Sequence, residues 1–260
     1  MVATPIGNLE EVSPRVRRVL GEASVIAAED TRVTRKLLGA LGIPCPELFS
    51  YRGHDEAQRA ERLLDRVAAE SVVLVSDAGT PAVSDPGQQL VRLCLKQGLP
   101  VQIVSGPSAV AAAVSGSGLA PVPFQFLGFP PRKAGPLRQW LRRFGSYPGS
   151  LVLFEAPVRT LATVRALAEV FPDREVTMCR ELTKLHEELL LLPVADLLAD
   201  LQARERIRGE VVLVVGPGEA PADEGKAAAE LGNLKQIAAA LAERWGCTKR
   251  EAYQRLLALE

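Results

Sequence analysis

Short apolar segments alternate with amphipathic ones along the first 119 residues of the chain. Three apolar segments have the length and composition of buried strands: residues 25–28, 72–75 and 101–104. Three segments have helical spacing: residues 34–41, 56–69 and 88–97. Ser13 followed by Pro14 is a typical start of one more helix, before the first strand. Strands that alternate with helices predict a parallel sheet in an α/β domain.

The pattern is interrupted at residues 118–123, GLAPVP, where we place a domain boundary. Five strands and three helices are expected after it: strands 124–127, 151–154, 175–179, 187–192 and 210–215, and helices 137–144, 159–170 and 194–202. Residues 216–225 are rich in Pro, Gly and acidic side chains and have the composition of a linker. Beyond them, apolar residues at helical spacing predict a small helical tail. We therefore expect two α/β domains, residues 1–119 and 124–217, and a helical tail at 226–260.

Three loops of small residues follow expected strands: residues 4–8, 76–87 and 105–109. Because the carboxyl ends of parallel strands share one edge of a sheet, these loops are expected to form one binding rim. The longest, SDAGTPAVSDPG, lies in a stretch without Lys or Arg between Arg66 and Arg92. Such a loop is suited to a ligand held by main-chain groups and short hydroxyls, and it suits a cationic ligand better than a phosphate.

The composition limits the possible partners. The chain of 260 residues carries 31 basic and 31 acidic side chains, so a nucleic acid can be bound only by a local basic patch. No apolar segment reaches the roughly 20 residues that span a bilayer, and we expect a cytoplasmic protein without membrane contact. Neither the four cysteines nor the two histidines are spaced like metal ligands, so no metal site is predicted.

One segment, residues 132–143, is basic and contains no acidic residue. Its five cations are candidates for phosphate contacts with RNA: Arg132, Lys133, Arg138, Arg142 and Arg143. Phe129 and Trp140 stand beside them and are able to stack on bases, but Trp140 and Phe144 fit a core position better. A solvated helix face is the alternative interpretation of the charges.

Several motifs along the chain match a known family: VATPIGNLEEVSPR, AAEDTR, LVSDAGTPAVSDPG, SGPSA, GFPPRK, FEAPVR, CRELTKLHEE and RGEVVLVV. They resemble the tetrapyrrole-methylase fold of S-adenosylmethionine-dependent methyltransferases. Within that fold, the chain is most similar to the ribosomal RNA small-subunit methyltransferase I family. The resemblance implies methylation of a cytidine 2′-hydroxyl in small-subunit ribosomal RNA, a cofactor cleft between the two domains, and a homodimer.

The resemblance also implies which residues contact S-adenosylmethionine: Pro5, Gly7, Ser76, Asp77, Ala78, Thr80, Pro107, Ser108, Ala109, Phe154, Glu155, Met178 and Arg180. Removal of the hydroxyl proton requires a base or a group that stabilises the alkoxide. Asp30 or Glu181 is expected to accept the proton, while Lys184, Arg180 or Arg32 holds a phosphate or the alkoxide. These polar clusters are equally compatible with an interdomain ion-pair network, since positioning alone supplies much of the rate.

Two other functions remain open from the sequence. A tetrapyrrole methyltransferase of the same fold would require a large open cleft, and the basic segment at 132–143 argues against it. A ribosome-binding factor without catalytic activity would bind subunits but transfer no methyl group.

Overall fold

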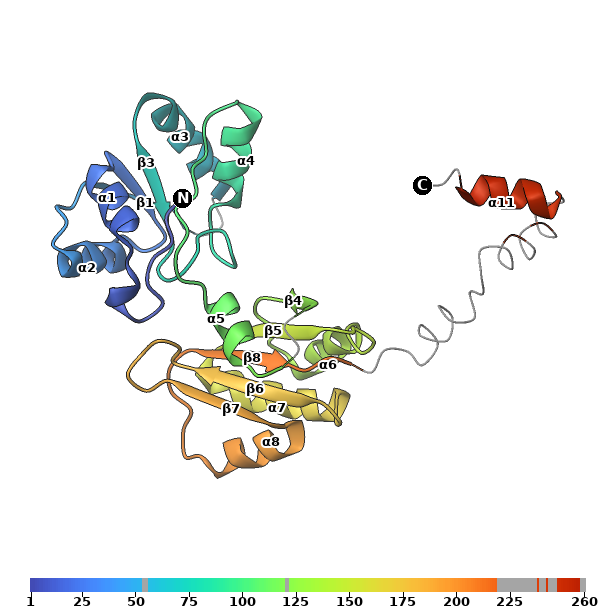
Figure 1. Ribbon diagram of the computed structural model, residues 1–260. Coiled ribbons are helices and arrows are strands. Elements are labelled where there is room, and N and C mark those ends of the chain that lie inside the picture. Colours follow the sequence, from blue (N-terminus) through green and yellow to red (C-terminus); the bar gives the residue numbers. More distant parts are fainter. Residues whose placement is uncertain (53–55, 120–121, 219–237, 239–241, 243–246, 258–260) are drawn as a thin grey trace.

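The computed structural model describes the chain except for residues 53–55, 120–121, 219–237, 239–241, 243–246 and 258–260. Two α/β domains lie one above the other in Figure 1. The elements of the first are η1 (Leu9–Glu11), α1 (Pro14–Glu22), β1 (Val25–Ala28), α2 (Thr31–Leu41), β2 (Glu47–Ser50), α3 (Glu56–Ala69), β3 (Val72–Val75) and α4 (Gln88–Lys96). Its sheet has the order β2-β1-β3, and both strand pairs are parallel, as predicted.

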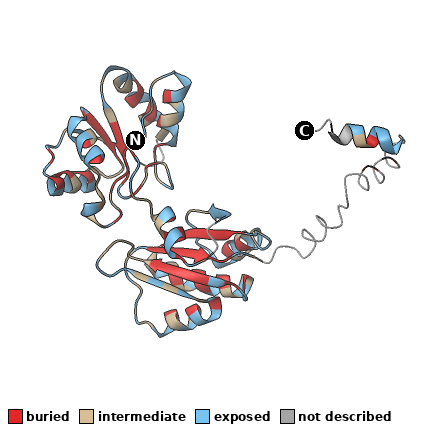
Figure 2. Ribbon diagram, in the orientation of Figure 1, coloured by how far each residue is buried: buried red, intermediate tan, exposed pale blue. Residues whose placement is uncertain are grey.

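Helices cover both faces of this sheet. Apolar residues of α1 and α2, among them Leu20 and Leu38, pack on one face. Residues of α3 and α4, among them Leu63 and Leu90, pack on the other. Figure 2 shows that buried residues concentrate in the strands and on the helix sides that meet them. This arrangement leaves the loops at the carboxyl ends of the strands free of covering helices.

The strand predicted at 101–104 is wrong. Only Val104 pairs, through an isolated parallel bridge with Val2, and the Ala3 amide donates to the Val104 carbonyl at 3.1 Å. The Val2 amide in turn donates to the Leu74 carbonyl of β3 at 3.0 Å. Val2 therefore lies between β3 and Val104. Strand β2 was not predicted, because only its two central residues, Leu48 and Phe49, are apolar and neither is fully buried.

The second domain contains β4 (Phe124–Phe126), α6 (Ala134–Arg142), β5 (Ser150–Glu155), α7 (Pro157–Val170), β6 (Glu175–Arg180), β7 (Glu188–Pro193), α8 (Val194–Ala203) and β8 (Val211–Val215). Its sheet has the order β4-β5-β8-β6-β7, in which only β4 and β5 are parallel. The three remaining strand pairs are antiparallel. The sheet is therefore mixed, with β6 and β7 as consecutive antiparallel strands.

One helix links the two domains. α5 (Ala109–Gly116) was not predicted as a helix, and it begins directly after the third small-residue loop. Ser108 caps it by accepting a hydrogen bond from the Ala111 amide. Its buried residues Val110 and Ala113 pack against β5, β6 and β8 of the second domain. A helix on the amino-terminal side of the predicted boundary therefore helps to form the core of the second domain.

Much of the predicted tail lies outside the described residues, including Leu234, Ile237 and Leu241. In the described part, α11 (Lys249–Leu257) follows Thr248, which exchanges hydrogen bonds with Glu251 in a capping box. Ala238, Ala242 and Ala252 are buried together, and α11 lies apart from both domains in Figure 1. Among the described residues, no helix combines the length and the apolar character needed to cross a membrane.

Candidate functional site

A pocket of about 290 Å³ lies between the two domains. Its lining is Ile6, Ala78, Gly79, Thr80, Val83, Asp85, Ser108, Ala109, Val110, Phe129, Phe154, Glu155, Ala156, Pro157, Glu210, Val211 and Val212. The first domain contributes loop residues, and the second contributes the end of β5 and the start of β8. This lining contains no Lys or Arg, which agrees with a site for an uncharged or cationic ligand.

Hydrogen bonds join the three small-residue loops, which confirms that they form one rim. Thr4 and Gly79 exchange two backbone hydrogen bonds of 2.9 and 3.0 Å. The Thr80 hydroxyl donates to the Pro107 carbonyl at 3.2 Å, which connects the second loop to the third. Within the second loop, Ala82 and Ser84 have φ angles of 67° and 68°, a left-handed conformation rare for residues with a Cβ. Backbone strain of this kind is concentrated at functional sites.

Six of the residues expected to contact the cofactor line this pocket: Ala78, Thr80, Ser108, Ala109, Phe154 and Glu155. Pro5, Gly7 and Asp77 line a neighbouring groove instead. The hydroxyl of Ser76 lies 3.3 Å from the carbonyls of Ala78 and Gly79, so it stabilises the conformation of the long loop by hydrogen bonding. Pro107 takes part through its carbonyl, as described above.

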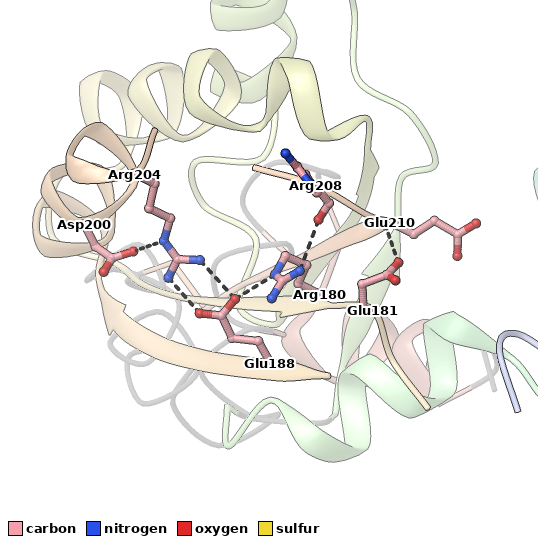
Figure 3. Close-up of polar contacts among 7 residues, drawn as sticks. All are labelled: Arg180, Glu181, Glu188, Asp200, Arg204, Arg208 and Glu210. Atoms are coloured by element: carbon pink, nitrogen blue, oxygen red, sulfur yellow. Dashed lines mark hydrogen bonds and ion pairs between the residues drawn. The ribbon is translucent and has the colours of Figure 1, made fainter. Parts of the chain in front are cut away.

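Two of the expected cofactor residues have other surroundings. The Met178 side chain is fully buried in the core of the second domain, among the residues that contact α7 and α8. Arg180 forms an ion pair of 2.7 Å with Glu188, and Arg204 binds the same carboxylate (Figure 3). These two cations lower the pKa of Glu188 to about 2. The Arg180 guanidinium is therefore already neutralised within the second domain.

Three carboxyl groups, those of Glu29, Asp77 and Asp85, lie near one another on the first domain, and none forms an ion pair with a described residue. Glu29 accepts a hydrogen bond from the Asp77 amide at 3.3 Å, and Asp85 lines the pocket itself. Desolvation raises the pKa of all three groups, and each also feels a neighbouring negative charge. For Asp85 the pKa rises to about 6 through burial and the nearby Glu29. The site thus has an excess of negative charge that a bound cation would relieve.

Asp30 and Arg32 form an ion pair at the start of α2. Asp30 Oδ2 lies 2.5 Å from Arg32 Nη2, and Asp30 Oδ1 accepts the Arg32 amide at 2.8 Å as the helix cap. The Asp30 amide donates to Asp77 at 2.9 Å, which places the pair beside the second loop. Hydrogen bonds from Arg32 hold the pKa of Asp30 far below its usual range. A carboxylate with so low a pKa is a weak base.

Glu181 and Lys184 form a second ion pair, in the loop between β6 and β7. Lys184 Nζ lies 2.8 Å from Glu181 and 3.0 Å from Glu210. The Glu210 amide donates to Glu181 at 2.9 Å, as Figure 3 shows. The hydrogen bond from Lys184 lowers the pKa of Glu181. Among the described residues, no hydrogen bond or ion pair joins Asp30 to Glu181. Both ion pairs therefore weigh against the expected role of either carboxylate as the proton acceptor.

Lys184 also brings the two domains into contact. A Cβ atom added to Gly7 would collide with Cγ of Lys184, so only glycine leaves room for this side chain. Glu181 and Thr183 adopt φ angles of 52° and 66°, which turns the loop between β6 and β7 toward the first domain. The expected catalytic residue Lys184 and the expected cofactor residue Gly7 thus meet at the rim, although they are far apart in the sequence.

The basic segment lies on and around α6 and is only partly neutralised. Arg138 pairs with Glu169 at 3.1 Å, whereas Arg132, Lys133, Arg142 and Arg143 are exposed and have no ion pair with any described residue. Trp140 packs edge-to-face on Phe144 against the core, as expected. Phe129 is 60% exposed, packs on Phe154 and lines the pocket.

The sequence does not predict that Asp85 and Phe129 line the pocket. The signal for Asp85 was its place in the long loop, and that for Phe129 was its place beside the basic segment. Neither signal distinguishes a residue that faces a pocket from one that faces solvent.

The pKa of Asp85 predicts a pH-dependent cost in stability. Below pH 3.8, its ordinary value, the carboxyl is protonated in both the folded and unfolded states, and the cost is absent. It reaches its full size once the pH exceeds 6, where the folded carboxyl is ionised too. Asp85→Asn is therefore expected to raise the free energy of unfolding at pH 8 by about 1 to 2 kcal/mol, after allowance for partial exposure.

Urea unfolding of the wild type and of Asp85→Asn at pH 8 and pH 4 measures the difference in free energy of unfolding between them. This difference is expected to become small at pH 4. Asp173→Asn is the matched control, because Asp173 is exposed and carries no described ion pair. Its effect is expected to stay within about 0.5 kcal/mol at both pH values. Lower stability of Asp85→Asn at pH 8 would show that the folded state does not disfavour this carboxylate.

Solved structures show the same fold. A diphthine synthase superposes with a TM-score of 0.61 at 16% identity, covering 83% of this chain and 88% of that one. A uroporphyrin-III C-methyl transferase from Thermus thermophilus gives 0.57 at 20% identity, covering 83% and 95%. At these identities the likeness establishes the fold alone.

Sequence comparison establishes the family. A family model described as Tetrapyrrole (Corrin/Porphyrin) Methylases matches residues 1–198. Ribosomal RNA small subunit methyltransferase I of Hydrogenobaculum sp. (strain Y04AAS1) is 41% identical, covering 83% of this chain and 94% of that protein. The Pseudomonas aeruginosa protein of the same name is 40% identical, covering 99% and 95%. The chain therefore belongs to the tetrapyrrole methylase family and, within it, to the ribosomal RNA small subunit methyltransferase I family.

Proposed function

We propose that this protein transfers a methyl group from S-adenosylmethionine to the ribose 2′-hydroxyl of a cytidine in small-subunit ribosomal RNA. The observation that carries the proposal is the interdomain pocket, which combines main-chain loops, carboxylates and no basic side chain. The relatives named above support the substrate, since their names state the methylation of small-subunit ribosomal RNA. A solved structure of the same fold is a complex with S-adenyl homocysteine.

The residues of the pocket fit S-adenosylmethionine. Glu29, Asp77 and Asp85 supply negative charge for a sulfonium, which would offset the desolvation that raises their pKa values. The amide groups at the start of α5 suit a carboxylate, because a helix N-terminus favours negative charge. Phe154 and the apolar residues Val211 and Val212 give the second domain a surface for an aromatic ring.

When bound, the cofactor supplies the activated methyl carbon. The remaining work belongs to the protein: it holds the ribose hydroxyl in line with that carbon and accepts the hydroxyl proton. Asp85 is the carboxylate best suited to accept it, because it lines the pocket and no ion pair with a described residue lowers its basicity. Asp30 and Glu181 remain candidates, although their ion pairs lower their basicity.

The role expected from the sequence for Arg32 and Lys184, holding a phosphate or the alkoxide, is compatible with their ion pairs. Arg32 is 76% exposed on its side chain even though it contacts Asp30, so its guanidinium is accessible to a phosphate. Lys184 stands over Gly7 at the rim, within reach of a ligand that bridges the two domains. We therefore assign Arg32 and Lys184 to positioning the RNA backbone or to stabilising the developing alkoxide.

The direct test of the function is transfer of labelled methyl from S-adenosylmethionine to purified small ribosomal subunits, with nuclease mapping of the product. Label at a single alkali-resistant cytidine is the expected result, because 2′-O-methylation blocks cleavage at that position. Binding of subunits without transfer would instead favour a non-catalytic binding factor. Transfer only to a tetrapyrrole would favour the other enzymatic activity of this fold.

The unpaired cations around α6 are proposed to contact RNA phosphates. Replacing Arg142 and Arg143 by alanine should lower the slope of log K against log salt by about 1.4, or roughly 0.7 for each phosphate that is no longer neutralised. Filter binding of labelled single-stranded RNA at several salt concentrations measures this slope. Arg92→Ala/Lys96→Ala is the matched control, since both residues are exposed on α4 and the change in net charge is the same. An equal decrease in both double variants would contradict specific contacts at α6.

We also propose that the protein is a homodimer and works in the cytoplasm, where ribosomal subunits are available. β7 is an edge strand of the second sheet, and it exposes Leu189 and Leu191 at 46% and 39%. An exposed apolar edge strand is a natural surface for pairing with another chain. These features support a dimer contact on the second domain.

Light scattering during size-exclusion chromatography tests this proposal at micromolar protein concentration. The expected mass is twice the 27.9 kDa of one chain. Leu189→Lys/Leu191→Lys should shift the protein toward the monomer, because two charges cannot be buried at an apolar contact without a large desolvation cost. A wild-type protein that elutes as a stable monomer would rule the proposal out.

A further inference from the structure

A second hollow on the first domain is separate from the interdomain pocket. It has a volume of about 300 Å³ and is lined by Pro5, Gly7, Leu9, Val33, Lys36, Leu37, Ala40 and Asp77. We call it the α2 groove, because four of these residues belong to α2. Its walls are mainly aliphatic, and Leu9 and Val33 are 48% and 38% exposed. An apolar surface of this kind is accessible to a ligand with a flat, weakly polar face.

The helix that forms the groove is basic. α2 contains Arg32, Arg35 and Lys36 and no acidic residue. Arg32 is paired with Asp30, whereas no ion pair joins Arg35 or Lys36 to any described residue. Arg35 and Lys36 are both exposed, and Lys36 lines the groove. An aliphatic groove bordered by unpaired cations matches a ligand that has both apolar faces and negative charges.

The position of the groove connects it to the proposed site of methyl transfer. Asp77 stands at one end, and its carboxylate accepts the Asp30 amide while its own amide donates to Glu29. Gly7 stands beside it under the stem of Lys184 from the second domain. The groove therefore starts at the loops proposed to hold the cofactor and leads outward along α2.

We infer that the α2 groove binds an unpaired nucleotide of the RNA substrate adjacent to the methylated one, with Lys36 and Arg35 contacting its phosphates. The inference rests on the proposed RNA methyltransferase activity. Nucleic acid has the required combination of flat bases and a charged backbone. A volume of this size is at the lower end of the range for small-ligand sites, which suits one nucleotide and excludes a duplex. RNA would then contact α2 of the first domain and α6 of the second, on both sides of the cleft.

The experiment compares Arg35→Ala/Lys36→Ala with the wild type in binding to labelled single-stranded RNA and to purified small subunits. Removing two charges that neutralise phosphates should reduce the slope of log K against log salt by about 1.4. The KM for subunits should rise about tenfold at moderate salt, while kcat and the calorimetric Kd for S-adenosylmethionine stay unchanged. Val33→Asp tests the aliphatic wall separately, and it should weaken RNA binding because it places a negative charge in the groove.

The control is Arg92→Ala/Lys96→Ala, which removes the same charge from α4 on the opposite face of the sheet. Equal effects in the two double variants would overturn the inference, because they would show a general charge effect. Weaker binding to subunits with unchanged binding to free RNA would also overturn it and would indicate a ribosomal protein as the occupant. Absence of methyl transfer by the wild type would contradict the proposed function, whereas the RNA-binding comparison tests the groove independently.

Discussion

The site depends on one exchange of backbone hydrogen bonds, between Thr4 and Gly79. It joins the first loop of the chain to the long loop after β3 without using a side chain. Gly79 has a φ of 78°, and a Cβ there would lie 3.3 Å from Ile6, so the contact favours glycine. Because the long loop is also tied to Pro107 through Thr80, the rim of the pocket is a connected main-chain structure. Residues on it can therefore present carboxylates and strained backbone to a ligand.

The distribution of charge separates two kinds of ligand. Inside the pocket, Asp85 forms no ion pair with a described residue and its pKa rises to about 6, a condition that a cationic ligand would relieve. Outside the pocket, cations without a described ion pair stand on two helices, for example Lys36 on α2 and Arg142 on α6. A net charge of zero hides this arrangement, since acidic and basic side chains cancel over the whole chain. The protein can therefore attract a polyanion to its surface and a cation to its interior.

The second domain contributes more than one wall of the pocket. Helix α5, from the amino-terminal side of the predicted boundary, packs on its sheet. Val110 of α5 and Val212 of β8 belong to the same hydrophobic core. The loop between β6 and β7 returns to the first domain and lays Lys184 over Gly7. Glu181 and Glu210 hold the ammonium group of that lysine. The polar contacts that were expected to be catalytic are therefore also part of the contact between the domains.

The sequence alone determined the family, the two α/β units, and the loops that form the rim. Each of these depends on local information: apolar segments of strand length, the Ser13 cap and the motif SDAGTPAVSDPG are all contiguous in the chain. Only the tertiary structure decided the antiparallel pairing of β6 with β7, because a periodic pattern does not encode strand direction. It also decided that Met178 faces the core and Phe129 the pocket. The same holds for protonation, since the pKa of Asp85 depends on burial and on Glu29, which tertiary folding brings near it from a distant part of the sequence.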